Sequence, residues 1–298
     1  MRLPHTMPSS SKTVSLVLGA GGARGLAHIG VIQWLTENGY RIRSIAGSSM
    51  GALVGGIYAA DKLEAYAEWT LALERMEVLR LLDPAFGRAG LFKGERVIAQ
   101  LRNLIGDADI EALPVSFTAV AMELETGREV WLREGKLFDA IRASIAIPLL
   151  LTPAELDGRM LVDGGLVNPV PIAPTLDDRN DLIVAVNPGG RYEQRAAQVT
   201  SAPIPGQNDY RQRIHAFIES LNPLKEAAVS APGMIDVALR SMEAMENTIA
   251  RLKLAAYSPD VTIEIPRNAC RIHEFWRAEE MIALGREKTA KAFGANAG

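Results

Sequence analysis

The sequence is poor in the residues that build disulfides and metal sites. Its 298 residues include one cysteine, Cys270, and four histidines, at His5, His28, His215 and His273. A single cysteine excludes an intramolecular disulfide framework and any site built from several cysteines. The histidines are scattered, and none has the H-E-x-x-H or a similar ligand spacing. We therefore expect no metal and no other cofactor.

An excess of positive charge is also missing. Lys and Arg number 32 and Asp and Glu number 35, so the net charge is −3. This balance gives no polycation to attract nucleic acid, and we expect no nucleic-acid partner. With 48% hydrophobic and 22% charged residues, the chain has the composition of a globular protein with a sizeable core.

No run of the sequence is apolar enough to cross a bilayer. The longest uncharged stretch, 44–60, contains three serines and four glycines, whereas a span needs about 20 predominantly apolar residues. The earlier run 14–18 is short and leads directly into glycines, which favours a buried strand over a signal peptide. We expect a cytoplasmic protein, with peripheral membrane association as the alternative.

Short apolar runs alternate with helical periodicity, as in βαβ units around a mainly parallel sheet. The predicted strands are 13–18, 42–46, 115–124, 129–132, 160–162, 182–186 and 261–265. The predicted helices include 26–37, one that ends at Ala60, a more polar helical stretch that leads to 82–84, and then 94–105, 210–222, 233–257 and 274–293. We expect a flexible tail at 1–12 and a single α/β domain over 13–298, with 205–257 as a helical insertion.

The most informative motif is Gly47-Ser48-Ser49-Met50-Gly51, which follows a predicted strand and opens a predicted helix. G-x-S-x-G in this context is a nucleophile elbow, a sharp turn that exposes its central serine. The central residue is Ser49, where the helix dipole favours a developing negative charge. The hydroxyl of Ser48 is the competing candidate for the nucleophile. The alternative without catalysis is that these small residues only form the start of a helix.

A glycine-rich loop at 19–25 also lies between a strand and a helix. Its consecutive amides form an anion-binding nest, which in acyl transfer would be an oxyanion hole. A dinucleotide-binding loop is one alternative, but Arg24 replaces the third glycine and no acidic residue follows the second strand. A purely structural turn is the other alternative.

A third motif, Asp163-Gly164-Gly165, follows the predicted strand 160–162. Such a sequence is usually a turn, but a serine nucleophile needs a base. We expect parallel strands that end at one edge to bring Asp163, Ser49 and the glycine loop together. None of the four histidines has a context that makes it a compelling base.

In this order and spacing, the motifs identify a family. The blocks at 19–25, 47–51, 143–148 and 163–165, spread over about 14–175, resemble the patatin-like phospholipases. The resemblance is strongest to the bacterial branch similar to the catalytic domain of neuropathy target esterase. It implies a three-layer α/β/α fold and lipid acyl hydrolysis by a Ser-Asp dyad without histidine.

By position, the resemblance makes Ser49 the nucleophile and Asp163 the base. The oxyanion hole would be formed by the amides of Gly21 and Gly22 with their neighbours Ala23 and Arg24. The family often has three consecutive glycines in this block, and Ala20 replaces the first of them here. Ser144, in another family block, is expected to shape the turn before Pro148.

We therefore expect a serine hydrolase that acts on a fatty-acyl ester, such as a phospholipid or lysophospholipid, through an acyl-enzyme. The alternatives are an acyltransferase and a regulatory or adaptor protein that retains the fold. Apolar faces and methionines over 210–257 suggest a border of the acyl pocket or a membrane contact. Packing on the domain or in a homo-oligomer explains the same faces.

Overall fold

The computed structural model describes residues 11–85, 90–193 and 233–295. The chain divides into two compact units, one made of 1–192 with 242–298 and the other of 193–241. The expected tail at 1–12 lies almost entirely outside the described residues, as does the predicted helix 210–222. The rest of the predicted insertion forms α8 (Met234–Tyr257), which belongs to the first unit from Met242 on.

The first unit is built on a sheet with the strand order β5-β6-β3-β2-β1-β7-β8, in which β4 also pairs with β3. The parallel strands are β1 (Thr13–Leu18), β2 (Arg41–Ser48), β3 (Ser116–Glu123), β7 (Leu182–Gly190) and β8 (Val261–Pro266). The antiparallel additions are β4 (Glu129–Leu132), β5 (Ala154–Leu156) and β6 (Arg159–Asp163).

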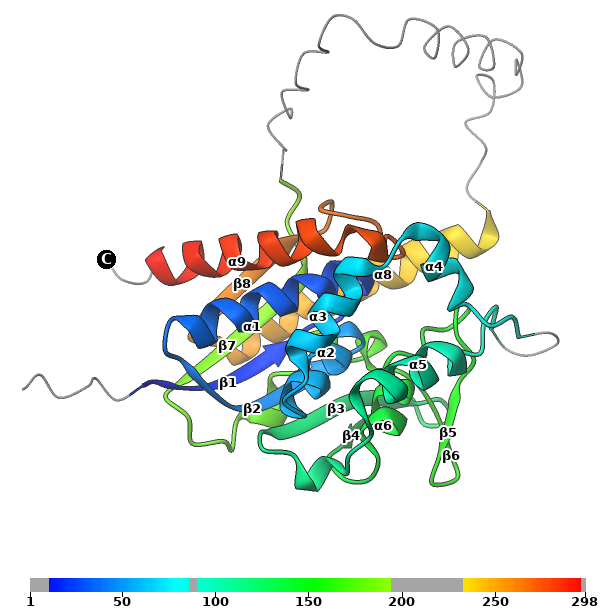
Figure 1. Cartoon of the computed structure of the whole chain (residues 1–298), viewed down its shortest axis with the longest axis horizontal. Helices are drawn as coiled ribbons and strands as arrows, with labels where there is room; N and C mark the ends of the chain where they lie inside the picture. Colours follow the sequence, from blue (N-terminus) through cyan, green and yellow to red (C-terminus); the bar gives the residue numbers. More distant parts are fainter. Residues whose placement is uncertain (1–10, 86–89, 194–232, 296–298) are drawn as a thin grey trace, which may run out of the picture. The chain divides into compact units, whose positions relative to one another are not determined.

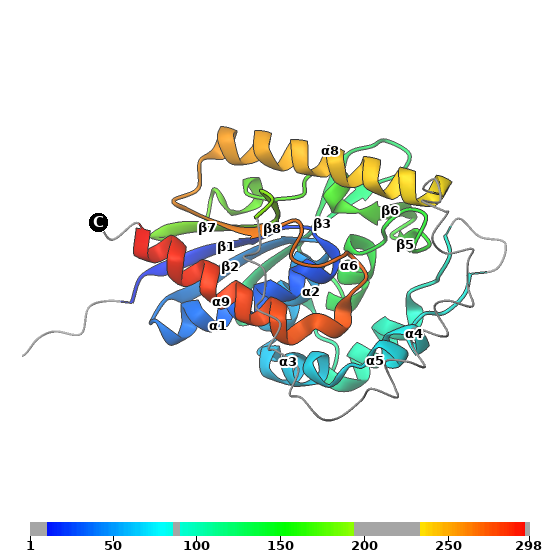
Figure 2. The same cartoon turned by 90° about the horizontal axis from the view of Figure 1, so that it is seen from above.

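The parallel strands are buried because helices cover both faces of the sheet. In β1 every residue after Thr13 is buried, which is why this strand reads as an almost continuous apolar run. Figures 1 and 2 show α1 (Ala27–Glu37), α2 (Met50–Ala59) and α9 (Ala278–Ala295) on one face. The part of α8 from Met242 on covers the other face, where Ala250 joins a core cluster with residues of β1 and β7. The predicted three-layer α/β/α fold is confirmed.

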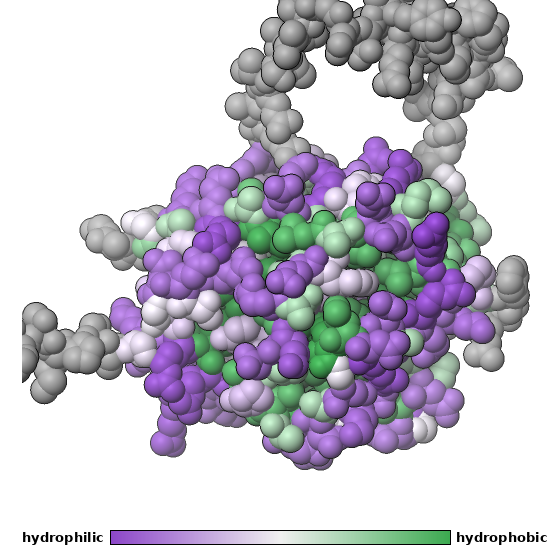
Figure 3. Space-filling model, viewed as in Figure 1, coloured by the Kyte–Doolittle hydropathy of each residue, from purple (hydrophilic) through white to green (hydrophobic). Residues whose placement is uncertain are grey.

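Four further helices flank the sheet beside α2: α3 (Leu63–Ala72), α4 (Arg75–Arg80), α5 (Glu95–Ile105) and α6 (Leu137–Ser144). The Asp83 carboxylate accepts hydrogen bonds from the amides of Gly94, Glu95 and Arg96, and so fixes the start of α5. Figure 3 shows the side of the molecule on which α3 lies in Figure 1. Apolar residues gather in the middle of this otherwise polar surface.

The sequence located most elements but missed two. β5 has only three residues, too few for a periodic pattern, and α6 is a short helix of which only Ala143 and Ser144 lie in a family block. The turn Asp157-Gly158 is a tight hairpin in which both residues have positive φ, at 50° and 72°. Over the described ranges, no helix combines the length and apolar character of a membrane span.

Candidate active site

Ser49 occupies a strained position between β2 and α2. Its φ is 56° and its ψ is −124°, a conformation that costs a residue with a side chain roughly 1–3 kcal/mol. The residue is only 3% exposed. Strain of this kind persists only where the surroundings enforce it, and here it lifts the hydroxyl away from the sheet.

Two glycines make this sharp turn sterically possible. A Cβ on Gly47 would lie 2.4 Å from backbone atoms of Gly51, and a Cβ on Gly51 would lie 1.9 Å from the carbonyl oxygen of Leu18. Both distances are far below contact distance, so α2 can lie this close to β1 and β2 only with glycine at both positions. The G-x-S-x-G pattern is therefore a packing requirement of the elbow.

Ser144, at the end of α6, holds the elbow in place. The Ser49 amide donates to Ser144 Oγ at 3.0 Å, and the Ser144 hydroxyl donates to the Val120 carbonyl at 2.6 Å. From the sequence, this serine was expected to shape the turn before Pro148. In the structure it connects the backbone of Ser49 to β3, a role that the sequence pattern does not reveal.

Asp163 is the hydrogen-bond partner of the Ser49 side chain. Ser49 Oγ donates to Asp163 Oδ2 at 2.6 Å, and the Gly165 amide donates to Asp163 Oδ1 at 2.7 Å. The prediction that a parallel strand would bring Asp163 to Ser49 was wrong, because β6 runs antiparallel to β3. Asp163 pairs with Ala121 of β3 while Ser48 pairs with Val120, so the hairpin delivers the aspartate beside the elbow.

The environment of Asp163 makes it a better base than an exposed aspartate. Burial raises the pKa of Asp163 to about 7, although the hydrogen bonds from Ser49 and Gly165 act in the opposite direction. The carboxyl therefore changes charge near neutral pH, where proton transfer to and from a hydroxyl is most effective. Ser48, the competing hydroxyl, is fully buried and its Oγ has no partner among the described residues.

The glycine loop lies beside the elbow and opens the short 3₁₀ helix η1 (Gly22–Leu26). Among the described residues, no backbone acceptor is found for the amides of Gly21 and Gly22. The Ala23 amide, by contrast, donates to the Ile272 carbonyl at 2.9 Å. Ala23 was one of the four amides expected in the oxyanion hole, and this bond already uses it.

The oxyanion prediction concerned the backbone amide of Arg24, whereas its side chain makes separate contacts. Its guanidinium donates to the Arg267 carbonyl at 2.7 Å and forms an ion pair with Glu243 of α8, also at 2.7 Å. Arg24 is 4% exposed. The side chain thus connects the glycine loop to two segments that are distant in sequence.

The two histidines that the structure describes, His28 and His273, take no part in the Ser49–Asp163 contact. His28 is fully buried, and its Nε2 donates to the Gly19 carbonyl at 2.9 Å. Burial lowers the pKa of His28 to about 4, so the ring is neutral at pH 7. His273 lines the cavity described below, with its ring 6.1 Å from that of Trp276. His5 and His215 lie outside the described residues.

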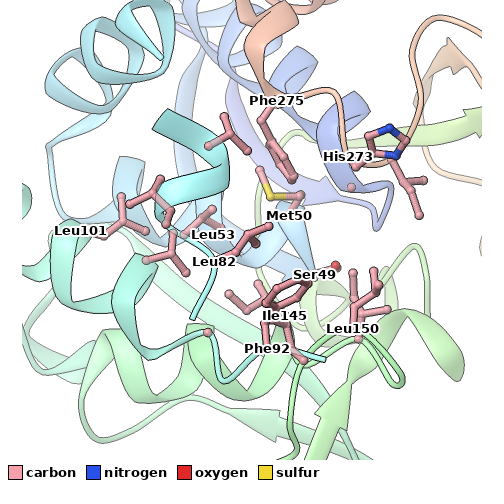
Figure 4. Close-up of a pocket in the computed structure, with 18 of the residues that line it drawn as sticks. Ser49, Met50, Leu53, Leu82, Phe92, Leu101, Ile145, Leu150, His273 and Phe275 are labelled. Carbon is pink, nitrogen blue, oxygen red and sulfur yellow. The ribbon is translucent and has the colours of Figure 1, made fainter. Parts of the chain in front are cut away.

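An apolar cavity of about 280 Å³ begins at Ser49. Figure 4 shows it extending from Ser49 past Leu53 and Leu82 to Leu101, with Phe92, Ile145 and Leu150 along one side. The lining comes from α2 to α5 and from the loops after α6 and before η5 (Phe275–Arg277). Tyr66 and Trp69 of α3 add aromatic surface. A cavity of this character suits a hydrocarbon chain.

In the described ranges, no group of three or more His, Cys, Asp or Glu side chains has the arrangement of a metal site. The groups described at this site are the Ser49 hydroxyl, the Asp163 carboxyl, two loop amides without a backbone acceptor among the described residues, and an apolar cavity.

Comparisons with known proteins show which proteins this chain is similar to. Residues 16–176 match the family described as patatin-like phospholipase. A Mycobacterium tuberculosis protein named as an uncharacterized NTE family protein is 39% identical over 334 residues, covering 96% of this chain and 93% of the relative. The lysophospholipase NTE1 of Pyricularia oryzae is 29% identical, over 92% of this chain and 18% of that protein. The crystal structure of VipD from Legionella pneumophila aligns with a TM-score of 0.44 at 13% identity, over 96% of this chain and 67% of VipD.

The family match includes the elbow, the glycine loop and Asp163, and it supports lipid hydrolase activity in general. It also spans more than half of the chain, and the mycobacterial relative aligns over nearly all of it. The protein therefore belongs to the patatin-like phospholipase family, in its NTE-like group.

Proposed function

We propose that this protein is a serine lipid acyl hydrolase that cleaves fatty-acyl esters with Ser49 as nucleophile and Asp163 as base. The observation that carries this proposal is the 2.6 Å hydrogen bond from Ser49 Oγ to Asp163 Oδ2 at the mouth of an apolar cavity. A nucleophile within hydrogen-bond reach of its base is the geometry that acyl transfer needs.

The reaction follows from the positions of these groups. As Ser49 Oγ attacks the ester carbonyl, its proton passes to Asp163, and the carbonyl oxygen becomes an oxyanion. The free amides of Gly21 and Gly22 are the donors available to that oxyanion. Collapse of the intermediate transfers the proton from Asp163 to the leaving alcohol and leaves Ser49 acylated. Water then repeats the sequence, with Asp163 again accepting and returning the proton.

The apolar lining of the cavity favours binding of a fatty-acyl group over binding of a small or polar acyl group. Its walls are mostly aliphatic and aromatic side chains that would cover the chain, and burial of each methylene stabilises a bound ligand by about 0.8 kcal/mol. The substrate class we propose is therefore a fatty-acyl ester, with phospholipids and lysophospholipids as the natural forms.

Labelling with a fluorophosphonate probe, followed by turnover of p-nitrophenyl esters and phospholipids, tests this function. Wild type is expected to label and to release fatty acid, and Ser49→Ala is expected to do neither while retaining its circular dichroism spectrum. Ser48→Ala is the matched control, because it removes the neighbouring hydroxyl from the same turn. Loss of turnover in Ser48→Ala alone would reject Ser49 as the nucleophile. Acyl transfer to an added alcohol, with no free fatty acid, would indicate an acyltransferase instead.

A further inference from the structure

A third ionisable group lies beside the dyad, on a helix that the catalytic motifs do not include. Glu246 is on α8, and its Oε1 lies 3.4 Å from the point where a Cβ on Gly165 would be. Asp163 Oδ1 lies 3.0 Å from that same point. Two carboxyl groups therefore approach the same glycine. A side chain there would also collide with Ala20, whose Cβ lies at 2.8 Å.

Close contacts on either side of Glu246 hold this part of α8 in place. One turn earlier, Glu243 forms the 2.7 Å ion pair with Arg24 of the glycine loop. The next residue, Asn247, approaches β7 so closely that its Oδ1 lies 2.0 Å from where a Cβ on Gly189 would be. Farther along, Ala250 is buried in the core. Glu246 is thus fixed in position by its own helix and is only partly exposed.

We propose that Glu246 is a positioning residue for the dyad, and that its carboxyl sets the proton affinity of Asp163. This inference rests on the proposed function, since the proton affinity of Asp163 matters to turnover only if Asp163 is the base. It adds a residue from outside the catalytic motifs and gives the neighbouring helix a part in the chemistry.

The charges around Glu246 indicate which carboxyl ionises first. The groups that face it are Asp163 at the end of β6, Glu243 on its own helix and Arg24 on η1. Burial raises the pKa of Glu246 to about 8, the negative charges of Asp163 and Glu243 raise it as well, and Arg24 lowers it. The charge of Asp163 thus raises the pKa of Glu246, whereas the causes that shift the pKa of Asp163 do not include Glu246, so Asp163 ionises first and Glu246 stays protonated beside it.

Ionisation of Glu246 should then make Asp163 a stronger base. Asp163 uses Oδ2 for Ser49, whereas its Oδ1 lies on the side of Gly165 and Glu246. During attack, Asp163 takes up the proton of Ser49, so the negative charge beside Glu246 is lost from Asp163 and appears on the ester oxygen. A charged Glu246 opposes the ionised ground state of Asp163 more than it opposes the transition state, and it accelerates the step.

Glu246→Gln tests this proposal, because glutamine keeps the shape and hydrogen-bonding capacity of a permanently neutral acid. Rates of p-nitrophenyl butyrate hydrolysis are measured from pH 5 to pH 10. We expect the two proteins to coincide below pH 7 and wild type to exceed the variant above about pH 8. The gain should be up to about tenfold, since one unit of pKa in the base is worth at most that factor. The exposed Glu64 of α3 supplies the control Glu64→Gln, which makes the same charge change elsewhere.

A ratio of rates that is constant with pH, or that falls above pH 8, would overturn the proposal. A second measurement does not depend on turnover, namely carbon-13 NMR titration of protein labelled at its carboxyl groups. The Asp163 signal is expected to show a second inflection near pH 8 that is absent in Glu246→Gln. If that inflection is found in a protein that cleaves no ester, the carboxyl pair stands and the proposed function fails. A single inflection in both proteins rejects the pair, whatever the activity.

Discussion

The two sides of Ser49 differ sharply in chemistry. On the side of α2 to α5, the residues around the serine are mostly apolar and enclose a cavity of about 280 Å³. On the side of β6 and α8, they are ionisable, with Asp163, Glu243, Glu246 and Arg24 close together. Under the proposed function, this difference meets two requirements of the Ser49 hydroxyl, because an acyl chain needs a dry cavity whereas proton transfer needs a carboxyl that can change charge.

The largest effect is expected on the ionisable side. Asp163→Asn retains the size of the side chain but removes the proposed base, and kcat should fall by roughly 10²–10⁴-fold, the usual contribution of a positioned general base. Steady-state hydrolysis of a p-nitrophenyl ester measures this. The cavity-lining His273 gives the comparison, and His273→Gln should change kcat much less. A His273 variant as inactive as Asp163→Asn, with its fold intact, would replace the dyad with a mechanism that uses histidine.

Asp163→Asn should also raise the stability of the protein at alkaline pH, because it removes a buried charge. The folded-state pKa of Asp163, about 7, lies above its ordinary value of 3.8. Stability from the protonated carboxyl is therefore complete below pH 3.8 and is lost as the pH rises through about 7. At pH 8 the variant should be more stable than wild type by on the order of 1–3 kcal/mol in urea unfolding, and at pH 4 about equal.

The pH dependence of wild-type turnover tests the same carboxyl without mutation. The base must be ionised, so kcat/KM should fall as the pH decreases through about 7, where Asp163 takes up its proton. Below that midpoint the loss approaches about tenfold for each pH unit. A profile that stays flat down to pH 5 would mean that Asp163 remains charged at that pH. Its pKa would then not be raised by burial.

The apolar side should be sensitive to the length of the acyl chain. Each buried methylene contributes about 0.8 kcal/mol, so kcat/KM should rise about fourfold per methylene until the chain fills the cavity. Leu82 lies between Ser49 and Leu101 in Figure 4, and Leu82→Trp should block the inner part. Long-chain p-nitrophenyl esters should lose this gain while the acetate is hydrolysed as before.

Leu104→Trp is the matched control for the cavity, since Leu104 of α5 is 39% exposed and does not line it. Equal chain-length profiles for Leu82→Trp and wild type would show that the acyl group binds elsewhere.

The smallest effect is expected where the two sides meet, at the elbow itself. Ser144→Ala removes the partner of the Ser49 amide and of the Val120 carbonyl. Leaving such buried groups unpaired costs about 1–3 kcal/mol, which thermal unfolding would detect. Turnover should fall as well, because the strained backbone of Ser49 loses a support. Ser144→Thr keeps a hydroxyl and is expected to recover part of both losses. Unchanged stability and turnover in Ser144→Ala would show that the elbow holds its conformation without this bond.

The membrane contact, the homo-oligomer and the cellular location stay predictions. The helical face expected to decide them includes Phe217 and Ile218, which lie outside the described residues. The predicted bounds of the insertion, 205–257, also stay a prediction. They differ from those of the second compact unit, 193–241.

The sequence by itself determined the local features of this protein. G-x-S-x-G demanded an elbow because only glycine lets α2 approach β1 and β2 so closely, and the pattern marked Ser49 as its centre. The strands of the parallel sheet were visible because residues buried on both faces must be apolar. Asp163 was found through a motif, although the parallel strand expected to carry it proved to be antiparallel.

Only the tertiary structure decided what surrounds these motifs. The antiparallel direction of β6, the bonds of Ser144 and the ion pair between Arg24 and Glu243 all join residues far apart in the chain. The raised pKa of Asp163 and the nearness of Glu246 likewise depend on burial and on the placement of α8. No local pattern encodes such contacts, because a carboxyl has the same sequence signature whether it lies in water or beside another charge in a dry site.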